Sequence, residues 1–417
     1  MNKSHLVLLA ITICGTLASA QTGDPLRWRE VFTDPQLVAL IDTALTHNTD
    51  LRTASIRVEQ ADAALRMSRM SILPSLSVGG EGSFSKEKST AAVSKYSLPV
   101  RLQWEVSLSE RYFAENKAAE GLLWNAEETE RAVRLQLVAA VASQYYTLMM
   151  LDEQLAITRE GVENARKTME VMQAMKEVGL QNEAAVAQAR TAWLSTATSE
   201  KTLQQQIIAA ESAMMLLLGQ QRDNISRNRC IPQTLPLDYT AGIPLETLSG
   251  RPDVKAAEYS LRAVTAQTDV ARSAFYPTLN ITASFNIPDM LTEAVGSLVQ
   301  PLFNMGKNKG NLRIAKAEQE ASLAAFSQTL LVASTEIRDA LSACRFSGER
   351  LSLRGQELEA ATKACEATSA LMQSGNATYL EVLSAQAALL QSRLSSSADR
   401  LDLLQSQINL YKASGGN

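Results

Sequence analysis

Two long stretches without proline constrain this sequence more than any other feature. Residues 112–178 and 311–374 contain no proline and are dominated by Ala, Leu, Glu, Gln and Arg, which favour the α-helix. A helix of this length extends for about 100 Å, which is deeper than a globular core, so such helices must pack along one another. Small apolar residues recur at heptad-like spacing, as at Leu135, Ala142 and Met149. The sequence therefore predicts an elongated molecule of antiparallel helices.

Each predicted long helix is followed by a glycine and then by a second helical stretch. Gly179 and Gly375 stand where the long helices are expected to end, because a helix often ends at a glycine in the left-handed conformation. The chain then turns back through predicted helices at about residues 182–218 and 378–412. Another helix is predicted at about residues 35–71, before the first strands.

Two segments change from the helical period to the alternation of a β-strand. Residues 98–108 and 279–287 alternate apolar and polar side chains, which predicts strands with one apolar and one polar face. Weaker partner strands are predicted at residues 76–84 and 295–303. The chain thus contains two predicted hairpins, or four strands.

The same order of elements occurs twice along the chain. Residues that align between the two copies are Asp50 with Asp253, Pro74 with Pro277, and Gly179 with Gly375. We therefore expect an internal two-fold repeat, with a first copy at residues 21–218, a connector at 219–250 and a second copy at 251–417. Three prolines mark the connector.

Residues 1–20 have the features of a secretory signal. Lys3 precedes an apolar stretch that is too short to span a bilayer, and residues 18–20 (Ala-Ser-Ala) form a small-x-small cleavage site. A lipoprotein signal with Cys14 as the lipidated first residue is the less favoured alternative, because Ile13 is not the small residue that such processing requires. Either interpretation predicts that the chain is exported.

Scarce residue types argue against several functions. Only two histidines are present, so a histidine metal site or a Ser/His/Asp triad has almost no residues to use. The four cysteines are too scattered for a disulfide scaffold or a zinc site. A net charge of -4 does not favour a nucleic-acid partner. We therefore expect that the protein is not an enzyme and binds neither a cofactor nor a resident metal.

Four strands are too few for a closed barrel, because the smallest packed barrels have about eight. An open sheet would expose unpaired edges, which the hydrocarbon of a membrane does not tolerate. Three copies of the chain would supply twelve strands and remove those edges. We therefore expect a mixed fold in which a shared 12-stranded transmembrane β-barrel continues as a long α-helical coiled-coil barrel. The alternative is that both hairpins are soluble caps on a coiled-coil bundle.

Several motifs resemble those of the outer membrane efflux protein family, the TolC-like channels. The motifs are residues 216–219 (LLLG), 241–244 (AGIP), 251–258 (RPDVKAAE), 274–279 (AFYPTL), 300–306 (QPLFNMG) and 411–416 (YKASGG). The resemblance implies a homotrimer in outer-membrane lipid that works with a periplasmic adaptor and an inner-membrane pump. It also implies a passive channel, without a cofactor, that exports drugs or other substrates.

The alternative function is a periplasmic coiled-coil adaptor or structural protein without a pore. Such an adaptor should carry a lipoyl-like β-domain between its helical arms, and the sequence contains no segment of that kind. The export channel is therefore the preferred prediction.

The resemblance places the periplasmic tip of the channel at the turns around Gly179 and Gly375. Glu381 matches a position at which some relatives have an acidic ring that narrows the tunnel, and Glu183 is a second gate candidate by proximity. A glutamate in the first turn of a helix is also favoured by the helix dipole alone.

Adaptors contact the same turns in the family, so Gly179, Leu180, Gly375 and Leu380 are the candidate docking residues. Helix capping and packing are the alternative roles for these four residues.

Overall fold

The computed structural model describes residues 27–85, 93–107, 110–221, 225–228, 235, 245–287, 291–299 and 306–416. The predicted signal, with Cys14 and the cleavage site, lies outside these residues. The helices are α1 (Trp28–Val31), α2 (Pro35–His47), α3 (Thr49–Met70), α4 (Arg111–Glu177), α5 (Glu183–Leu218), α6 (Leu245–Gly250), α7 (Pro252–Ser273), α8 (Lys307–Gln373) and α9 (Tyr379–Ala413). The strands are β1 (Ser75–Val78), β2 (Glu81–Ser85), β3 (Val93–Ser107), β4 (Thr278–Ile287) and β5 (Leu291–Val299).

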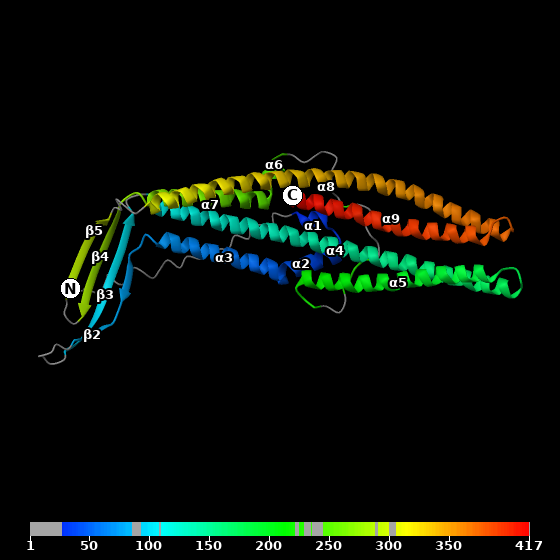
Figure 1. Cartoon of the computed structure of the whole chain (residues 1–417), viewed down its shortest axis with the longest axis horizontal. Helices are drawn as coiled ribbons and strands as arrows, with labels where there is room; N and C mark the ends of the chain where they lie inside the picture. Colours follow the sequence, from blue (N-terminus) through cyan, green and yellow to red (C-terminus); the bar gives the residue numbers. More distant parts are fainter. Residues whose placement is uncertain are drawn as a thin grey trace.

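The described chain forms a rod with a β-sheet at one end and two helical hairpins at the other (Figure 1). Helices α4 and α8 contain 67 residues each and run from the sheet to the far end, which makes each about 100 Å long. Near the sheet, α4 packs against α3 and α7, and towards the far end it packs against α5 and α9. The predicted long helices are therefore present, close to their predicted bounds.

The elements of the two halves have matching lengths. Helices α3 and α7 have 22 residues each, α4 and α8 have 67 each, and α5 and α9 have 36 and 35. In each half the order is helix, strands, long helix and return helix. This is the arrangement that an internal repeat would produce.

The main hydrophobic core lies midway along the rod, where α5 and α9 end. Its largest fully buried side chains include Trp28, Tyr145 and Tyr411. Ile225 and Leu235, from the connector, join the same core. The first and last described residues meet here as well, since the amide of Arg27 donates to the carbonyl oxygen of Gly416 at 3.1 Å. We call this region the waist of the rod.

The sheet is antiparallel, with β3 at its centre between β4 and the pair β1 and β2, and with β5 beside β4. Directly opposite residues of antiparallel strands share a face of the sheet. The apolar pairs on one face are Val100 with Phe285, Leu102 with Ala283, Trp104 with Ile281 and Val106 with Leu279. The polar pairs on the other face are Arg101 with Ser284, Gln103 with Thr282 and Glu105 with Asn280. The predicted two-faced strands are thus confirmed.

The predicted helix at residues 35–71 is wrong as a single element, because Asn48 divides it into α2 and α3. Asn48 has extended backbone angles, and its Oδ1 accepts hydrogen bonds from the amides of Asp50 and Leu51 at 2.9 and 3.0 Å. An asparagine that caps the following amides competes with the helix for them, which starts a new helix at this point.

Two strand predictions also need correction. The strand predicted at residues 295–303 begins earlier, at Leu291, and pairs with β4 as far as Val299, whereas residues 300–303 lie outside the described residues. The strand predicted at residues 76–84 consists of two pieces, β1 and β2, which are interrupted at Gly79 and Gly80 and both pair with β3. Glycine has no side chain to pack on a sheet, so an interruption at this pair is expected.

Candidate functional site

The far end of the rod contains the two predicted turns, and both have the same backbone geometry. Gly179 and Gly375 each have a φ of 78°, in the left-handed region that favours glycine. The amide of Gly179 donates to Lys176 and that of Leu180 to Met175, at 3.0 and 2.8 Å. In the second turn, Gly375 and Asn376 make the equivalent bonds to Met372 and Leu371, at 3.0 and 2.9 Å. These paired bonds are the Schellman motif that ends a helix.

Each turn is followed by a residue that caps the next helix. Asn182 accepts a hydrogen bond from the amide of Ala185 at 3.0 Å, at the start of α5. Thr378 begins α9 with a complete capping box, in which its amide and hydroxyl donate to Glu381 Oε2 at 2.6 and 2.9 Å. These hydrogen bonds hold the pKa of the Glu381 carboxyl below its usual range. The carboxylate of Glu381 is therefore exposed and charged, and it also stabilises its own helix.

Glu183 is the first residue of α5, and its carboxylate forms an ion pair with Lys176 at the end of α4. The Glu183 side chain is 74% exposed. The pair links the two helices of the first hairpin across its turn. Of the two gate candidates, Glu381 accepts hydrogen bonds from the helix cap at Thr378, and Glu183 is paired with Lys176.

The candidate docking residues belong to or adjoin the turns between α4 and α5 and between α8 and α9, and both turns lie at this end of the rod (Figure 1). The exposed fractions of Leu180 and Leu380 are 70% and 60%, and no side chain stands within 4 Å of a Cβ added at Gly179 or Gly375. The two turns therefore present apolar side chains to solvent without neighbours that cover them in the described chain.

Contacts between the two hairpins are part of this site that the sequence analysis missed. Arg393 on α9 pairs with Glu160 on α4 at 2.7 Å, and Arg400 pairs with Glu153 at 3.1 Å. These residues are more than 200 positions apart in the chain, so no local pattern could identify them. The seven-residue spacing between Glu153 and Glu160, repeated between Arg393 and Arg400, is the only signal the sequence holds.

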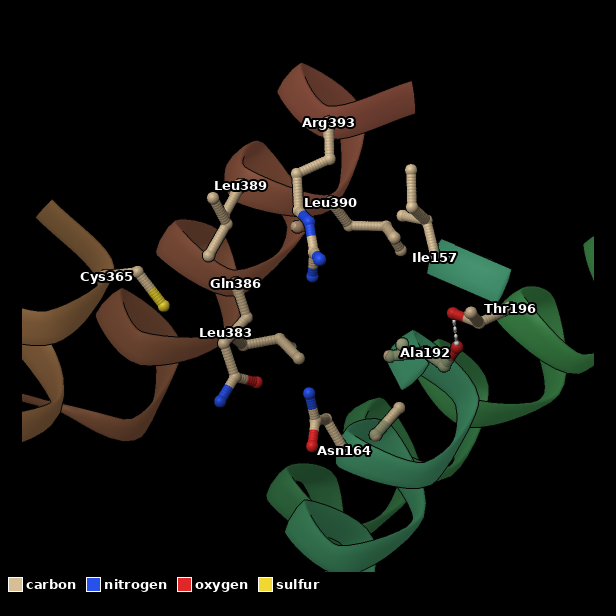
Figure 2. A pocket seen from close by; sticks show the side chains of 13 residues that line it. Ile157, Asn164, Ala192, Thr196, Cys365, Leu383, Gln386, Leu389, Leu390 and Arg393 are labelled. Atoms are coloured by element: carbon tan, nitrogen blue, oxygen red, sulfur yellow. Dashed lines mark hydrogen bonds between the residues drawn. The ribbon is translucent and has the colours of Figure 1, made fainter. Parts of the chain in front are cut away.

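A cavity of about 190 Å³ lies between the hairpins, close to these ion pairs. Figure 2 shows side chains of α4, α5, α8 and α9 around it, with the Cys365 sulfur and the Arg393 guanidinium directed towards the interior. Gly161 lets the Leu390 side chain lie close to the backbone of α4, because a Cβ at position 161 would stand 3.1 Å from Leu390. The cavity is lined by both apolar and polar side chains.

At the opposite end of the rod, the apolar face of the sheet is exposed. Leu76 and Val78 are each 69% exposed, Leu98 is 51% exposed and Leu298 is 64% exposed. Where the sheet meets the helices, the aromatic residues Phe113, Phe275 and Tyr276 are also exposed. Continuous apolar surface of this kind marks a membrane or protein contact.

The described residues contain no group of three or more His, Cys, Asp or Glu side chains placed to hold a metal ion.

None of the helices in the described ranges combines the length and the apolar composition that a membrane-spanning helix requires.

The sequence matches the outer membrane efflux protein family over residues 40–220 and 243–416, which together make up most of the chain. The chain belongs to the outer membrane efflux protein family. This match and the relatives described next confirm two predictions from the sequence. The first is the family, and the second is a location in the outer membrane with the helical rod extending into the periplasm.

Individual relatives of this outer membrane efflux protein cover nearly the whole chain. It is 29% identical to the cation efflux system protein CusC of Escherichia coli strain K12, over 96% of this chain and 91% of CusC. It is also 29% identical to the toluene efflux pump outer membrane protein TtgC of Pseudomonas putida, over 96% of this chain and 86% of TtgC. A crystal structure of CusC superposes with a TM-score of 0.88, at 28% identity and 94% coverage of both chains. The protein is thus an efflux channel protein.

Proposed function

We propose that three copies of this chain form one export channel, in which twelve strands close a barrel in the outer membrane and the helices continue as a periplasmic tunnel. Substrate enters at the tip from an inner-membrane pump through a periplasmic adaptor. The channel itself is passive and carries out no bond chemistry. The two halves of each chain, residues 21–218 and 251–417 joined by the connector, act as two of six similar units around the axis.

The observation that carries this proposal is the exposed apolar face of the sheet. The sheet, with Leu76, Val78, Leu98 and Leu298 exposed on one face, has no core of its own in the described chain. Its outer strands, β1 with β2 on one side and β5 on the other, are open edges. Lipid would cover the apolar face, and neighbouring copies would pair with both edges.

The helices support the same assembly. Helix α8 packs against α7 and α9 on one side of the rod, whereas α3 and α5 lie on the other side of α4. The large apolar side chains that α8 exposes are Ile314, Leu323, Leu331, Val332, Phe346, Leu353 and Leu371. Helix α5 exposes Leu194, Ile208 and Leu216. A head-to-tail ring would place α8 of one copy against α3 and α5 of the next and bury these side chains.

The names of the relatives fit a passive channel. CusC is named for cations and TtgC for toluene, yet both are 29% identical to this chain over 96% of its length. If the channel selected its substrate, we would expect its sequence to differ more between relatives with such different substrates. Equal similarity to both fits a channel whose substrate is selected by the pump.

At the tip, Glu381 and Glu183 are the proposed gate residues. Three copies of Glu381 would form an acidic ring that attracts cations, whereas the charge of each Glu183 is balanced by its ion pair with Lys176. Leu180 and Leu380 are the proposed contacts for the adaptor, because they are exposed apolar side chains beside the two turns. Gly179 and Gly375 allow the tight turns that present them.

The experiment is a measurement of particle mass. The protein is extracted from outer-membrane fractions in mild detergent, and its protein mass is determined by light scattering. We expect the mass of three chains. The double variant Leu331→Glu with Phe346→Glu should shift the mass to one chain, whereas Leu331→Met with Phe346→Leu should remain trimeric. A wild-type monomer in the soluble fraction would refute the channel and favour the pore-less coiled-coil protein.

A further inference from the structure

The cavity between the two hairpins is bounded by helices from both halves of the chain. Its lining comes from α4 and α5 in the first hairpin and from α8 and α9 in the second (Figure 2). Its volume is about 190 Å³. An engineered cavity of about 150 Å³ in another protein takes up benzene, so this space suits an apolar body of about six to eight carbon atoms.

Small residues keep the space open. Gly161 and Ala165 on α4 and Ala192 on α5 belong to the lining, and larger side chains there would occupy the cavity. Protein interiors are close-packed, and an unfilled space loses the contacts that its lining would otherwise make. Ile157 of α4 and Leu390 of α9 line the same space. A ligand would therefore find apolar contacts on both hairpins.

Three polar side chains of the lining have hydrogen-bond donors to spare. Figure 2 shows the Arg393 guanidinium directed into the cavity, and the side-chain amides of Asn164 and Gln386 belong to the same lining. Arg393 donates through Nη1 to Glu160 at 2.7 Å, and its other N–H groups have no acceptor among the described residues. Within the described chain, the two side-chain amides also have no hydrogen-bond partner. The cavity thus offers several unused N–H donors.

The charge of the lining favours an anion. Among the described residues that line the cavity, Arg393 alone is charged, and its partner Glu160 lines a neighbouring groove instead. A carboxylate accepts two parallel hydrogen bonds from a guanidinium and can accept others from amide N–H groups. A cation would meet no negative side chain in this lining.

We propose that this cavity binds a small amphiphilic carboxylate, with the carboxylate at the Arg393 guanidinium and the apolar chain against Ile157 and Leu390. Such a ligand contacts both hairpins at once, so it stabilises the arrangement in which the hairpins lie together. The site belongs to a single chain. It does not depend on the proposed trimer, so the failure of either proposal leaves the other standing.

Cys365 provides the reporter for the test, because its sulfur is directed into the cavity (Figure 2). The parent is the full-length protein in mild detergent with Cys230→Ser and Cys344→Ala, which leaves Cys365 as the one cysteine of the described residues. Mass spectrometry follows its alkylation by N-ethylmaleimide, a neutral reagent, at neutral pH and increasing octanoate concentration. The reporter control, Cys365→Ser with Ala364→Cys, moves the thiol to an exposed neighbouring position outside the lining.

Two variants of the cavity have matched controls. Arg393→Gln removes the guanidinium, and Arg400→Gln breaks the equivalent ion pair between the hairpins, with Glu153, outside this lining. Ala192→Leu fills the cavity from α5, and Thr191→Leu places the same side chain at the exposed position beside it. Octanol has a similar apolar chain without a carboxylate and tests the head group.

We expect octanoate to slow the alkylation of Cys365 in the parent and in the Arg400→Gln and Thr191→Leu controls, with the same half-saturating concentration. Arg393→Gln should raise that concentration about tenfold, because it removes charge-assisted hydrogen bonds. Ala192→Leu should abolish the protection. Octanol should protect less than octanoate, and the thiol at position 364 should not be protected.

No protection in the parent, or equal protection of the thiol at position 364, would overturn the proposal. Equal effects of Arg393→Gln and Arg400→Gln would also overturn it, because octanoate would then respond to the contact between the hairpins and not to the cavity. Far-UV circular dichroism checks that each variant is folded. If Arg393→Gln is not, the comparison of Ala192→Leu with Thr191→Leu decides.

Discussion

The backbone of Gly219 lies directly against that of His47, and a Cβ atom added at Gly219 would stand 2.3 Å from the His47 carbonyl oxygen. Gly219 ends α5 with a φ of 64°. One residue further along α2–α3, Asn48 Nδ2 donates to the Leu217 carbonyl oxygen at 3.0 Å. The end of α5 is therefore fixed to the break between α2 and α3, and this contact is part of the waist.

Gly219→Ala should destabilise the protein by about 2–5 kcal/mol, because the substitution adds a steric clash to the strain of a left-handed alanine. Gly179→Ala is the matched control, since its φ is 78° and nothing stands within 4 Å of the added Cβ. The control should cost only about 1–2 kcal/mol. Urea unfolding followed by far-UV circular dichroism measures both. Equal losses of stability would show that the backbone at Gly219 can move away from His47.

The pH dependence of stability should contain a contribution from Asp253. Burial would raise the pKa of its carboxyl, but hydrogen bonds at 3.0 and 2.7 Å from Arg251, and the positive charge of that residue, outweigh burial. They hold the pKa of Asp253 below its ordinary value of 3.8. A carboxyl with a lowered pKa in the folded state contributes stability above that ordinary value, and the contribution is lost as the pH falls through the folded pKa.

We therefore expect Asp253→Asn to be less stable than the wild type at neutral pH, and the difference in unfolding free energy to shrink below about pH 4. Urea unfolding at a series of pH values measures this difference. Arg166→Gln, which removes two exposed ion pairs, with Glu163 and with Glu170, is the control and should have little effect at neutral pH. A difference for Asp253→Asn that widens in acid would contradict the prediction.

Two adjacent residues of β3 test which face of the sheet meets lipid. Leu102 lies on the apolar face opposite Ala283, and Gln103 lies on the polar face opposite Thr282. Leu102→Arg should block insertion into the outer membrane, because an arginine on the lipid face of a barrel costs about 2–4 kcal/mol near the midplane. Gln103→Arg should insert normally. The readout is the amount of each variant in outer-membrane fractions, and equal insertion would contradict the assignment of faces.

Three variants at the start of α9 separate the gate role of Glu381 from its capping role. Glu381→Gln removes the charge but keeps an acceptor for the amide of Thr378. Thr378→Ala removes the hydroxyl of the cap but keeps the charge of Glu381. Glu381→Ala removes both the charge and the acceptor for the Thr378 amide. In planar bilayers, both Glu381 variants should lose cation preference, and Thr378→Ala should retain it. If only Glu381→Ala and Thr378→Ala alter conductance, the glutamate acts through helix capping.

The long helices could be predicted closely because their signals are local. The absence of proline, the abundance of good helix formers and the glycines at 179 and 375 lie within each segment, and the helices end beside those glycines. The alternation of β3 and β4 is equally local, and their register pairs the apolar faces that the pattern defines. The turns at the tip follow from the same glycines.

The remaining features depend on residues that are distant in the sequence. Asn48 breaks a helix that its neighbours would continue, and it also binds Leu217 across the waist. The position of β5 is set by pairing with β4, since its own alternation is weak. Tyr379 is buried against methionines of both hairpins, although its position at the start of a helix would suggest exposure. Such contacts arise only when the two halves of the chain come together.

The hydrogen bond between Arg27 and Gly416 fixes the position from which a segment before Arg27 or after Gly416 starts. Both residues lie at the waist, so a segment that continues directly from Arg27 or from Gly416 starts beside the middle of the rod. A segment that runs from Arg27 back to the sheet must follow the length of α3, which is about 33 Å for 22 residues. About ten residues of extended chain span that distance, and this sets the shortest tether that could join a lipid anchor to the rod.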